Sequence, residues 1–340
     1  MSLLDSIGKK EIWVTGKGGI GKTTTSAALA LHYAMKREWV LAFDIDGYHS
    51  MPDALNAEQI KDCRFRVPEN EVHHLFYDKI YQEHNLDLDL CLVSPRKIVE
   101  QVKENRKKNP ANRTKGLPRY FGILHMYDVL DQLGVLTASN DLAALCLITA
   151  ERNIHINNAK RQDNPQGRLI YDNQSSNATI ELLSRASSAV DRLKNMKKHN
   201  LEWRAKAAIA GWKDLGAFVK DDYIKNIEEY VRQFSNLTEC VKDPQKTFYL
   251  VVSGAGRSTE IQETERLVME LKETGFPVGA ILFNKVNQTT LANIQQYKNG
   301  MQSVPVYTSP QLEVFEKEKD VRVCLKEFNS AIKPFSNNTP

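Results

Sequence analysis

One short segment near the start of the chain has the composition and spacing of a phosphate-binding loop. The pattern GxxxxGK[ST] is matched by Gly16-Lys17-Gly18-Gly19-Ile20-Gly21-Lys22-Thr23, and Thr24 follows directly. The glycines allow successive backbone N–H groups to turn inward and form a cradle for an anion. Lys22 would reach the β and γ phosphates of a nucleotide, and the Thr23 hydroxyl would ligate Mg²⁺. We therefore predict that residues 16–24 hold the phosphates of a bound nucleotide.

Two further groups near this loop could take part in chemistry. Lys17 is a second lysine in the same loop, and one loop cannot easily direct two ammonium groups at one phosphate. Lys17 therefore either reaches across a subunit interface or is an ordinary solvent-exposed lysine. Asp46 ends the apolar segment WVLAFDID. An acid at the tip of a strand beside a phosphate loop is placed to orient water or Mg²⁺, although it can also be a helix cap.

The elements that must position these residues alternate between strand and helix. Apolar segments predict strands at 11–16, 39–46, 168–172, 247–254, 278–286 and 304–307. Helices are predicted at 23–36 and 259–274, the second stopped by Gly275 and Pro277. Strands that are apolar throughout and alternate with helices indicate a parallel sheet covered on both faces. The fold class is therefore α/β, a doubly wound and mostly parallel sheet of the P-loop NTPase topology with a helical insertion subdomain.

The remaining sequence is rich in helix formers and poor in strand signals. We expect residues 86–164 and 186–244 to form the helical subdomain. Residues 1–85, 165–185 and 245–335 would then form the ATPase core.

Bulk composition is that of an ordinary soluble globular protein, with 41% hydrophobic and 26% charged residues among 340. The sequence has no secretory signal and no run of about eighteen apolar residues that would span a membrane. Its five cysteines are scattered and odd in number, which favours free thiols and a reducing compartment. We therefore expect a cytoplasmic protein.

The net charge of +4 is mild, but basic residues are concentrated in two runs at 96–119 and 185–206. The first run holds nine Lys or Arg against two Glu. Such runs are most often solvated helix faces. The alternative is a docking face for a membrane surface, an acidic partner protein or nucleic acid, of which nucleic acid is the least expected.

The loop GKGGIGKT resembles the deviant phosphate loop of a group of dimeric ATPases. That group includes the nitrogenase iron protein, the partitioning and septum-site ATPases, the arsenite-pump ATPase and the tail-anchored-protein-targeting ATPase. The resemblance implies that Lys17 acts in trans within a homodimer that sandwiches the nucleotides. There it would stabilise charge in the transition state, as a supplied cationic finger does.

The segment after the second strand is similar to the first switch of the arsenite-pump and tail-anchor-targeting branch, DPAHSLSDAF. The matching residues are Asp46, His49, Ser50, Asp53 and Ala54, whereas Gly47 replaces the proline. By this resemblance Asp46 positions the attacking water. The second switch of that branch reads DTAPTGHTLR, and here Asp172 and Thr179 match while the proline, glycine and histidine are missing. The resemblance implies that Asp172 holds Mg²⁺ through water.

A third region, with an ETER segment at residues 263–266, also resembles this branch. The branch uses an asparagine after the following strand to recognise adenine, which here is Asn284. An amide can donate to one edge nitrogen of adenine and accept from its exocyclic amine. Pro305 and Val306 would begin the loop that closes over the base. The implied cofactors are ATP and Mg²⁺.

The resemblance implies an ATPase whose hydrolysis opens and closes a helical domain for a hydrophobic or membrane-protein client. The insertion has few methionines, mainly Met126 and Met196, so its apolar runs are more often core than groove. Neither a zinc CxxC pair nor clustered thiols for arsenite are visible in the spacing. Two alternatives remain: a partitioning-like ATPase that binds DNA or a membrane through its basic helices, and a nucleotide-binding regulator with slow turnover. The altered second switch favours the regulator.

Overall fold

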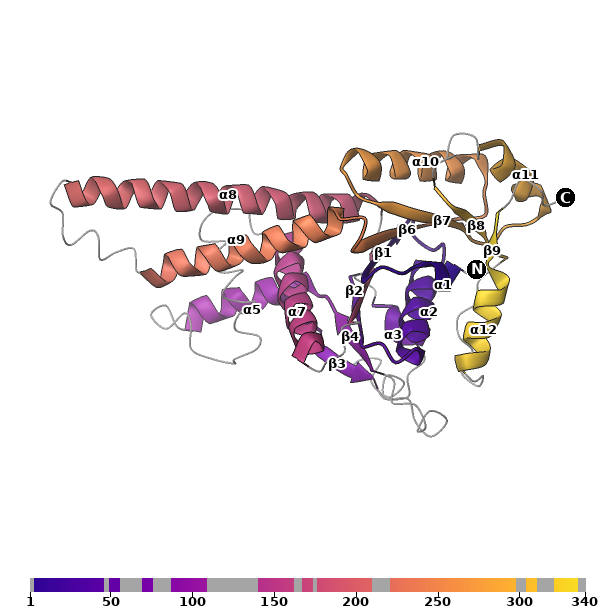
Figure 1. Ribbon diagram of the computed structural model, residues 1–340, viewed down its shortest axis with the longest axis horizontal. Coiled ribbons are helices and arrows are strands. Elements are labelled where there is room, and N and C mark those ends of the chain that lie inside the picture. Colours follow the sequence, from indigo (N-terminus) through magenta and orange to yellow (C-terminus); the bar gives the residue numbers. More distant parts are fainter. Residues whose placement is uncertain are drawn as a thin grey trace. The chain divides into compact units, whose positions relative to one another are not determined.

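A computed structural model describes residues 3–45, 49–55, 69–75, 87–108, 140–161, 167–173, 176–209, 221–297, 304–310 and 321–335 (Figure 1). The strands are β1 (Glu11–Gly16), β2 (Val40–Asp44), β3 (Val72–Leu75), β4 (Leu88–Leu92), β5 (Arg168–Asp172), β6 (Thr247–Ser253), β7 (Val278–Phe283), β8 (Val306–Thr308) and β9 (Lys333–Pro334). The helices are α1 (Leu3–Ser6), α2 (Lys22–Met35), α3 (Met51–Leu55), α5 (Pro95–Lys108), α7 (Asn140–Arg161), α8 (Ser176–Ile209), α9 (Asp221–Lys242), α10 (Ser258–Glu273), α11 (Gln288–Tyr297) and α12 (Val321–Ala331).

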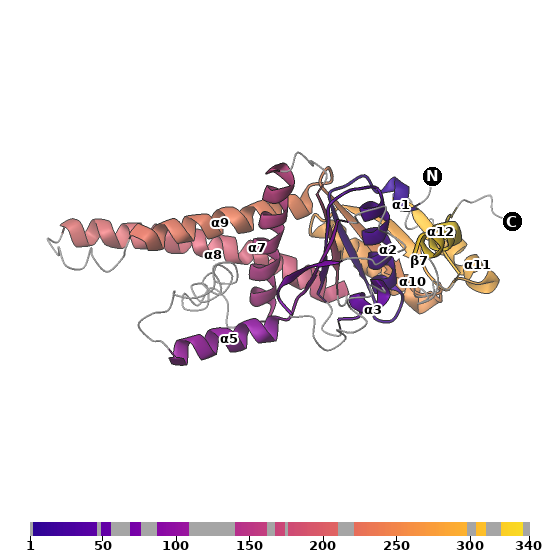
Figure 2. The same cartoon turned by 90° about the horizontal axis from the view of Figure 1, so that it is seen from below.

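The described strands form one sheet in the order β3-β4-β2-β5-β1-β6-β7-β8-β9. All neighbours pair in parallel except the edge strands β3 and β9, which run antiparallel. Helices α2 and α12 cover one face of the sheet and α10 covers the other (Figure 1). Figure 2 views the same layers from the α2 side. The predicted α/β class with a mostly parallel, doubly wound sheet is confirmed.

The two faces of the sheet are built from alternating residues of the same strands. Ile12 and Val14 of β1 join the apolar core against α2, whereas Trp13 points to the opposite face. On that face Trp13 stacks on Tyr171 of the neighbouring strand at a centroid separation of 3.9 Å, and Tyr171 stacks on Phe43 at 5.1 Å. These rings are in register across β2, β5 and β1, so cross-strand stacking stabilises the pairing of the central strands.

The chain divides into two compact units. The first contains Met1–Ser94, Ile154–Ile180 and Val241–Pro340, and the second contains Pro95–Asn153 and Glu181–Cys240. Within the second unit, Arg185 of α8 pairs with Asp141 of α7 at 2.6 Å, and Lys197 of α8 pairs with Glu228 of α9 at 2.7 Å. Two cations of the basic run 185–206 are therefore paired inside this unit. No helix in the described part of the chain is long and apolar enough to cross a membrane.

Strand β4 lies in the region that we expected to be helical, and the structure places it in the sheet of the first unit. Its sequence, LDLCL, has an acid at the second position of a strand whose five residues are all buried, and this acid interrupts the apolar pattern. Asp89 is tolerated there because Trp39 Nε1 donates a hydrogen bond to its carboxylate at 2.8 Å.

The bond between Trp39 and Asp89 gives a testable contribution to stability. Replacing Trp39 by Phe removes the indole N–H while keeping a ring, so we expect the free energy of unfolding to fall by about 1–3 kcal/mol in urea titrations. A double-mutant cycle with Asp89→Ala isolates the bond. If the two substitutions prove additive, the hydrogen bond contributes nothing and this explanation of β4 is wrong.

Candidate nucleotide-binding site

The loop between β1 and α2 has positive φ at three glycines, Gly16, Gly19 and Gly21, and two of these also leave no space for a Cβ atom. Gly16 has φ 146° and Gly21 has φ 97°, both in the region that side chains disfavour. A Cβ atom on Gly16 would lie 2.0 Å from the Val252 carbonyl oxygen, and one on Gly21 would lie 2.5 Å from Asn284 Nδ2. At Gly18 and Gly19, by contrast, an added Cβ would meet open space. The loop is thus fastened at both ends and accessible in the middle.

The polar side chains at the end of the loop and the start of α2 lie together at the carboxyl end of the central strands. Lys22 is buried, and its Nζ donates a hydrogen bond to the Lys17 carbonyl oxygen at 2.7 Å. Its ammonium therefore lies over the loop, where phosphate oxygens would replace a carbonyl as its partner. The Thr23 and Ser50 hydroxyl oxygens lie 3.2 Å apart, so the segment after β2 reaches the start of α2. Thr24 is buried in the first turn of that helix.

Asp172 ends β5 beside these hydroxyls and has an unusual environment. Its pKa is raised from 3.8 to about 7, first because burial disfavours the carboxylate and second because Asp44 lies close to it. The Thr23 and Ser26 hydroxyls and Lys22 oppose this shift only in part. Ser26 donates to Asp172 Oδ1 at 3.0 Å, whereas Oδ2 is buried and has no hydrogen-bond partner in the described structure.

These features fit a divalent cation held by hard oxygen ligands. A buried carboxylate oxygen that lacks a donor, beside a threonine hydroxyl, matches the preference of Mg²⁺ for oxygen. The predicted metal residues Thr23 and Asp172 are therefore brought together by the fold. No cluster of three or more His, Cys, Asp or Glu that could hold a metal occurs among the described residues, so a site here would need oxygens from a nucleotide or water.

Two acids, Asp44 and Asp46, lie at the carboxyl end of the segment predicted as the second strand. Asp44 is buried and accepts a hydrogen bond from the Met51 backbone N–H at 3.0 Å, which fixes the first turn of α3. His49 Nδ1 lies 3.8 Å from the other Asp44 oxygen. Asp44 thus caps α3 and also raises the pKa of Asp172, and only the second effect was not anticipated from the sequence. Asp46, the predicted water-positioning residue, lies outside the described residues.

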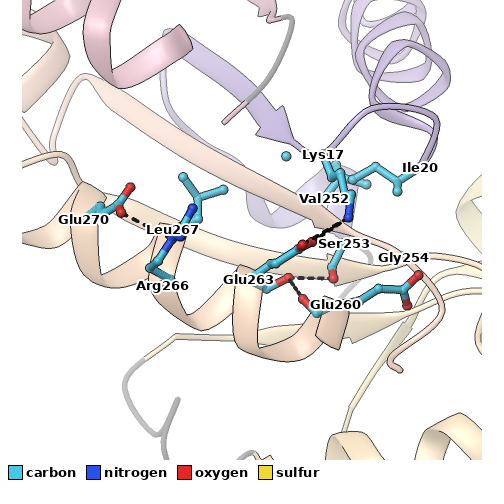
Figure 3. A pocket seen from close by; sticks show the side chains of 12 residues that line it. Lys17, Ile20, Val252, Ser253, Gly254, Glu260, Glu263, Arg266, Leu267 and Glu270 are labelled. Atoms are coloured by element: carbon cyan, nitrogen blue, oxygen red, sulfur yellow. Dashed lines mark hydrogen bonds and ion pairs between the residues drawn. The ribbon is translucent and has the colours of Figure 1, made fainter. Parts of the chain in front are cut away.

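Lys17 is held on its own chain. Its Nζ donates to both carboxylate oxygens of Glu263 on α10, at 3.1 and 2.9 Å (Figure 3). Glu263 belongs to the ETER segment, and both side chains are largely exposed. A pocket of about 280 Å³ adjoins this ion pair, between the end of β6 and α10. A role for Lys17 in another subunit therefore requires it first to leave Glu263.

Three residues were predicted from the sequence to surround the base: Asn284, Pro305 and Val306. The Asn284 side chain is fully buried and donates from Nδ2 to the Ile20 carbonyl oxygen at 2.8 Å, so it contacts the phosphate loop. Val306 is buried within β8 in register with Ile281, and the Pro305 carbonyl accepts from the Ile281 N–H. Val306 is the first residue of β8 and Pro305 directly precedes it, and their part in closing over the base stays a prediction.

Ser309 and Pro310 follow the carboxyl end of β8. The Ser309 backbone N–H donates to the Phe283 carbonyl at 2.8 Å, and its carbonyl accepts from Val286 at 2.9 Å. Strand β8 ends at Thr308, one residue beyond the end of the strand predicted at 304–307, and Pro310 follows two residues later.

A glycine loop between a central parallel strand and a helix, followed by Lys22, Thr23 and a buried acid, defines a P-loop nucleotide-binding protein. The family described as "Anion-transporting ATPase" matches residues 9–323, and the chain belongs to this family.

Individual relatives are distant over the full length and closer in short regions. The ATPase GET3 of Komagataella phaffii is 25% identical over 291 residues, which is 84% of this chain and 75% of the relative. A putative arsenical pump-driving ATPase of Chlorobaculum tepidum is 24% identical over 277 residues, 80% of this chain and 60% of that protein. The ATPase get3 of Pyrenophora tritici-repentis is 46% identical over only 63 residues, 18% of this chain and 19% of that protein.

The raised pKa of Asp172 predicts how Mg²⁺ binding depends on pH. Below about pH 7 the carboxyl is protonated, and the cation must displace that proton, so affinity should rise about tenfold per pH unit and level off above pH 7. The ligand-free fold should show the opposite trend in stability. The pKa of Asp172 is higher in the folded chain than in the unfolded chain. Asp172 therefore stabilises the folded state at low pH, and this stabilisation is lost as the pH rises from 3.8 to about 7.

Calorimetry in buffers of different ionisation enthalpy would count the released proton. The variant Asp172→Asn should bind Mg²⁺ weakly with no such pH dependence. A wild-type affinity that is flat between pH 5 and pH 8 would show that Asp172 is already ionised, contrary to this prediction.

Proposed function

We propose that this chain binds Mg·ATP in the loop from Gly16 to Thr24 and hydrolyses it as a homodimer in the cytoplasm. The observation that carries the proposal is the partnerless oxygen of buried Asp172, which lies beside the threonine and lysine that follow the phosphate loop. Mg²⁺ would supply the positive charge that a buried Asp172 carboxylate needs as a partner. Phosphate oxygens of the nucleotide would complete the coordination of the cation. Membership of an ATPase family supports the same reaction.

The residues of the loop have separate tasks in this proposal. Backbone N–H groups between Gly16 and Lys22 and the start of α2 would bind phosphate oxygens. Lys22 would balance the charge on the β and γ phosphates, while Thr23 and Asp172 would hold Mg²⁺, directly or through water. Mg²⁺, when bound, neutralises charge that develops on the phosphates. Asp46 would orient the attacking water, as the family resemblance implies.

Lys17 would act on the nucleotide of the partner subunit. Its exposed position and its surface ion pair with Glu263 support this, because an exposed pair is weak enough to exchange. ATP binding would then favour the dimer in which each Lys17 leaves its own Glu263 and approaches the phosphates across the interface.

Coupling to the helical unit would follow from the path of the chain. Helix α8 begins at Ser176, shortly after Asp172, and runs without a break to Ile209 in the second unit. The Thr179 hydroxyl near its start lies 3.2 Å from the Thr15 hydroxyl of β1, so this end is attached beside the phosphate loop. We propose that the nucleotide state acts on the helical unit through α8 and so controls binding of a hydrophobic or membrane-protein client.

A regulator with slow turnover is the second candidate. The missing proline, glycine and histidine of the second switch favour it, because that loop normally changes conformation with the nucleotide. Binding would be preserved in this case and hydrolysis would be slow. A DNA- or membrane-binding partitioning ATPase is less well supported, since Arg185 and Lys197 of the second basic run are paired internally.

The role of Lys17 can be tested by turnover. Lys17→Ala should bind Mg·ATP nearly as well as wild type but hydrolyse it about 1,000-fold more slowly, since a cationic finger acts on the transition state. Lys36→Ala, which removes another exposed lysine paired with Asp5, is the matched control and should be unaffected. Equal rates for Lys17→Ala and wild type would contradict the role; a wild type that binds but scarcely hydrolyses ATP would favour the regulator.

The ion pair with Glu263 makes a separate prediction. Glu263→Gln should release Lys17 and strengthen ATP-dependent dimerisation by about two- to fivefold per protomer, the usual strength of an exposed pair. Asp5→Asn breaks a comparable exposed pair with Lys36 and serves as the control in sedimentation experiments. In the double variant Lys17→Ala/Glu263→Gln the gain should disappear. Weaker dimerisation in Glu263→Gln would mean that Glu263 contributes to the dimer instead of restraining Lys17.

A further inference from the structure

We propose that Ser50 is a ligand of the Mg²⁺ that accompanies the nucleotide, and that it adds a second hydroxyl oxygen beside that of Thr23. This inference rests on the proposed function, because it concerns the same nucleotide site. It goes beyond the metal residues predicted from the sequence, which were Thr23 and Asp172. It also gives the segment after β2 a direct part in holding the cation.

The Thr23 hydroxyl has polar neighbours on two sides. The Ser50 Oγ atom lies 3.2 Å from Thr23 Oγ1, and the Asp172 carboxyl interacts with the same hydroxyl. The Oδ2 atom of Asp172 is buried and has no hydrogen-bond partner among the residues that the structure describes. The segment after β2, the start of α2 and the end of β5 therefore bring oxygen atoms to one place, where a cation would satisfy the buried carboxylate.

The separation of the two hydroxyl oxygens suits one Mg²⁺ ion. Mg²⁺ binds oxygen ligands at about 2.1 Å in octahedral geometry, so ligands at adjacent corners lie about 3.0 Å apart. The observed 3.2 Å between Thr23 and Ser50 is close to that spacing. Both residues are partly exposed, so a cation with its phosphate and water ligands can reach them.

Local structure leaves the Ser50 hydroxyl available for a contact outside its own helix. Ser50 directly precedes α3 and its carbonyl oxygen accepts from the Ala54 N–H at 3.1 Å, so it occupies the N-cap position. A serine there usually accepts, through its hydroxyl, a hydrogen bond from the second or third N–H of the helix. The second residue of α3 is Pro52, which has no N–H, and the first N–H, that of Met51, donates to Asp44 at 3.0 Å. The Asp44 carboxylate thus stabilises the start of α3 in place of a serine cap.

A neutral hydroxyl is a suitable ligand here because the site already holds several charges. Asp44 and Asp172 are buried acids, and Lys22 is buried beside them. A hydroxyl oxygen adds coordination without a further negative charge next to the phosphates of the nucleotide. The alternative is that the contact between Ser50 and Thr23 is a hydrogen bond that only fastens α3 to α2.

Calorimetry with the non-hydrolysable nucleotide AMPPNP separates these two roles, because the metal can be left out. Ser50→Ala should weaken binding of Mg·AMPPNP about 10- to 100-fold and leave binding of AMPPNP in EDTA unchanged, since only the first complex contains the cation. Ser50→Thr keeps a hydroxyl and should restore binding of Mg·AMPPNP. Ser253→Ala is the matched control. It breaks another contact between hydroxyls, with Thr264 at 2.7 Å, and should change neither affinity.

A change of metal tests direct ligation. In Ser50→Cys a softer sulfur replaces the oxygen, so the affinity for Mg·AMPPNP should fall while the affinity for Cd·AMPPNP rises relative to wild type. Ser253→Cys adds a thiol away from the proposed ligands and should leave the ratio of these two affinities unchanged. A contact that only fastens α3 would not respond to the softness of the metal.

The remaining outcomes are equally definite. If Ser50→Ala weakens nucleotide binding equally with and without Mg²⁺, or changes neither affinity, Ser50 is not a ligand. The same holds if Ser50→Cys keeps the metal preference of wild type. If Ser50→Ala does not fold, Ser50→Cys carries the test, because its side chain has nearly the same size. A wild type that binds neither Mg·ATP nor Mg·AMPPNP would instead overturn the proposed function, and the inference with it.

Discussion

The conformation of the phosphate loop depends on contacts that neighbouring elements make with its glycines and carbonyl groups. A glycine-rich segment has many conformations, and an unrestrained one would lose much entropy on binding. Here Gly16 lies against the Val252 carbonyl, Lys22 bonds to the Lys17 carbonyl, and Asn284 bonds to the Ile20 carbonyl. These contacts come from β6, α2 and the turn after β7. The order of the sheet, with β1 between β5 and β6, is what brings them together.

Electrostatics gives the site its second constraint. A pair of buried acids, Asp172 and Asp44, lies beside a buried lysine at the end of the same loop. Because the pKa of Asp172 is near 7, ionising this buried acid at higher pH costs the protein stability. A bound cation would stabilise the carboxylate and offset that cost. Stability and binding are therefore in opposition at this residue, a pattern that recurs at functional sites.

The sequence predicted the parts of the molecule that depend on local pattern. The loop, β1, α2 and the position of Asp172 follow from glycine spacing and from apolar runs that end in polar residues, and the structure contains these elements. Strand β4 was missed because the bond from Trp39 that stabilises its buried Asp89 joins residues far apart in the chain. The direction of the Asn284 amide and the pairing of Lys17 with Glu263 were equally invisible, since both depend on which strand ends lie beside the loop. The strand predicted at 304–307 is β8 at 306–308, and the predicted roles of Pro305 and Val306 at the base stay predictions.

The central claim is that this chain holds the phosphates of Mg·ATP in the loop before α2. Isothermal titration of the full chain with Mg·ATP, alongside Lys22→Ala, tests it most directly. The account predicts saturable binding of one nucleotide per chain in wild type and its loss in the variant. The absence of binding heat in wild type, or equal affinity in both proteins, would contradict it.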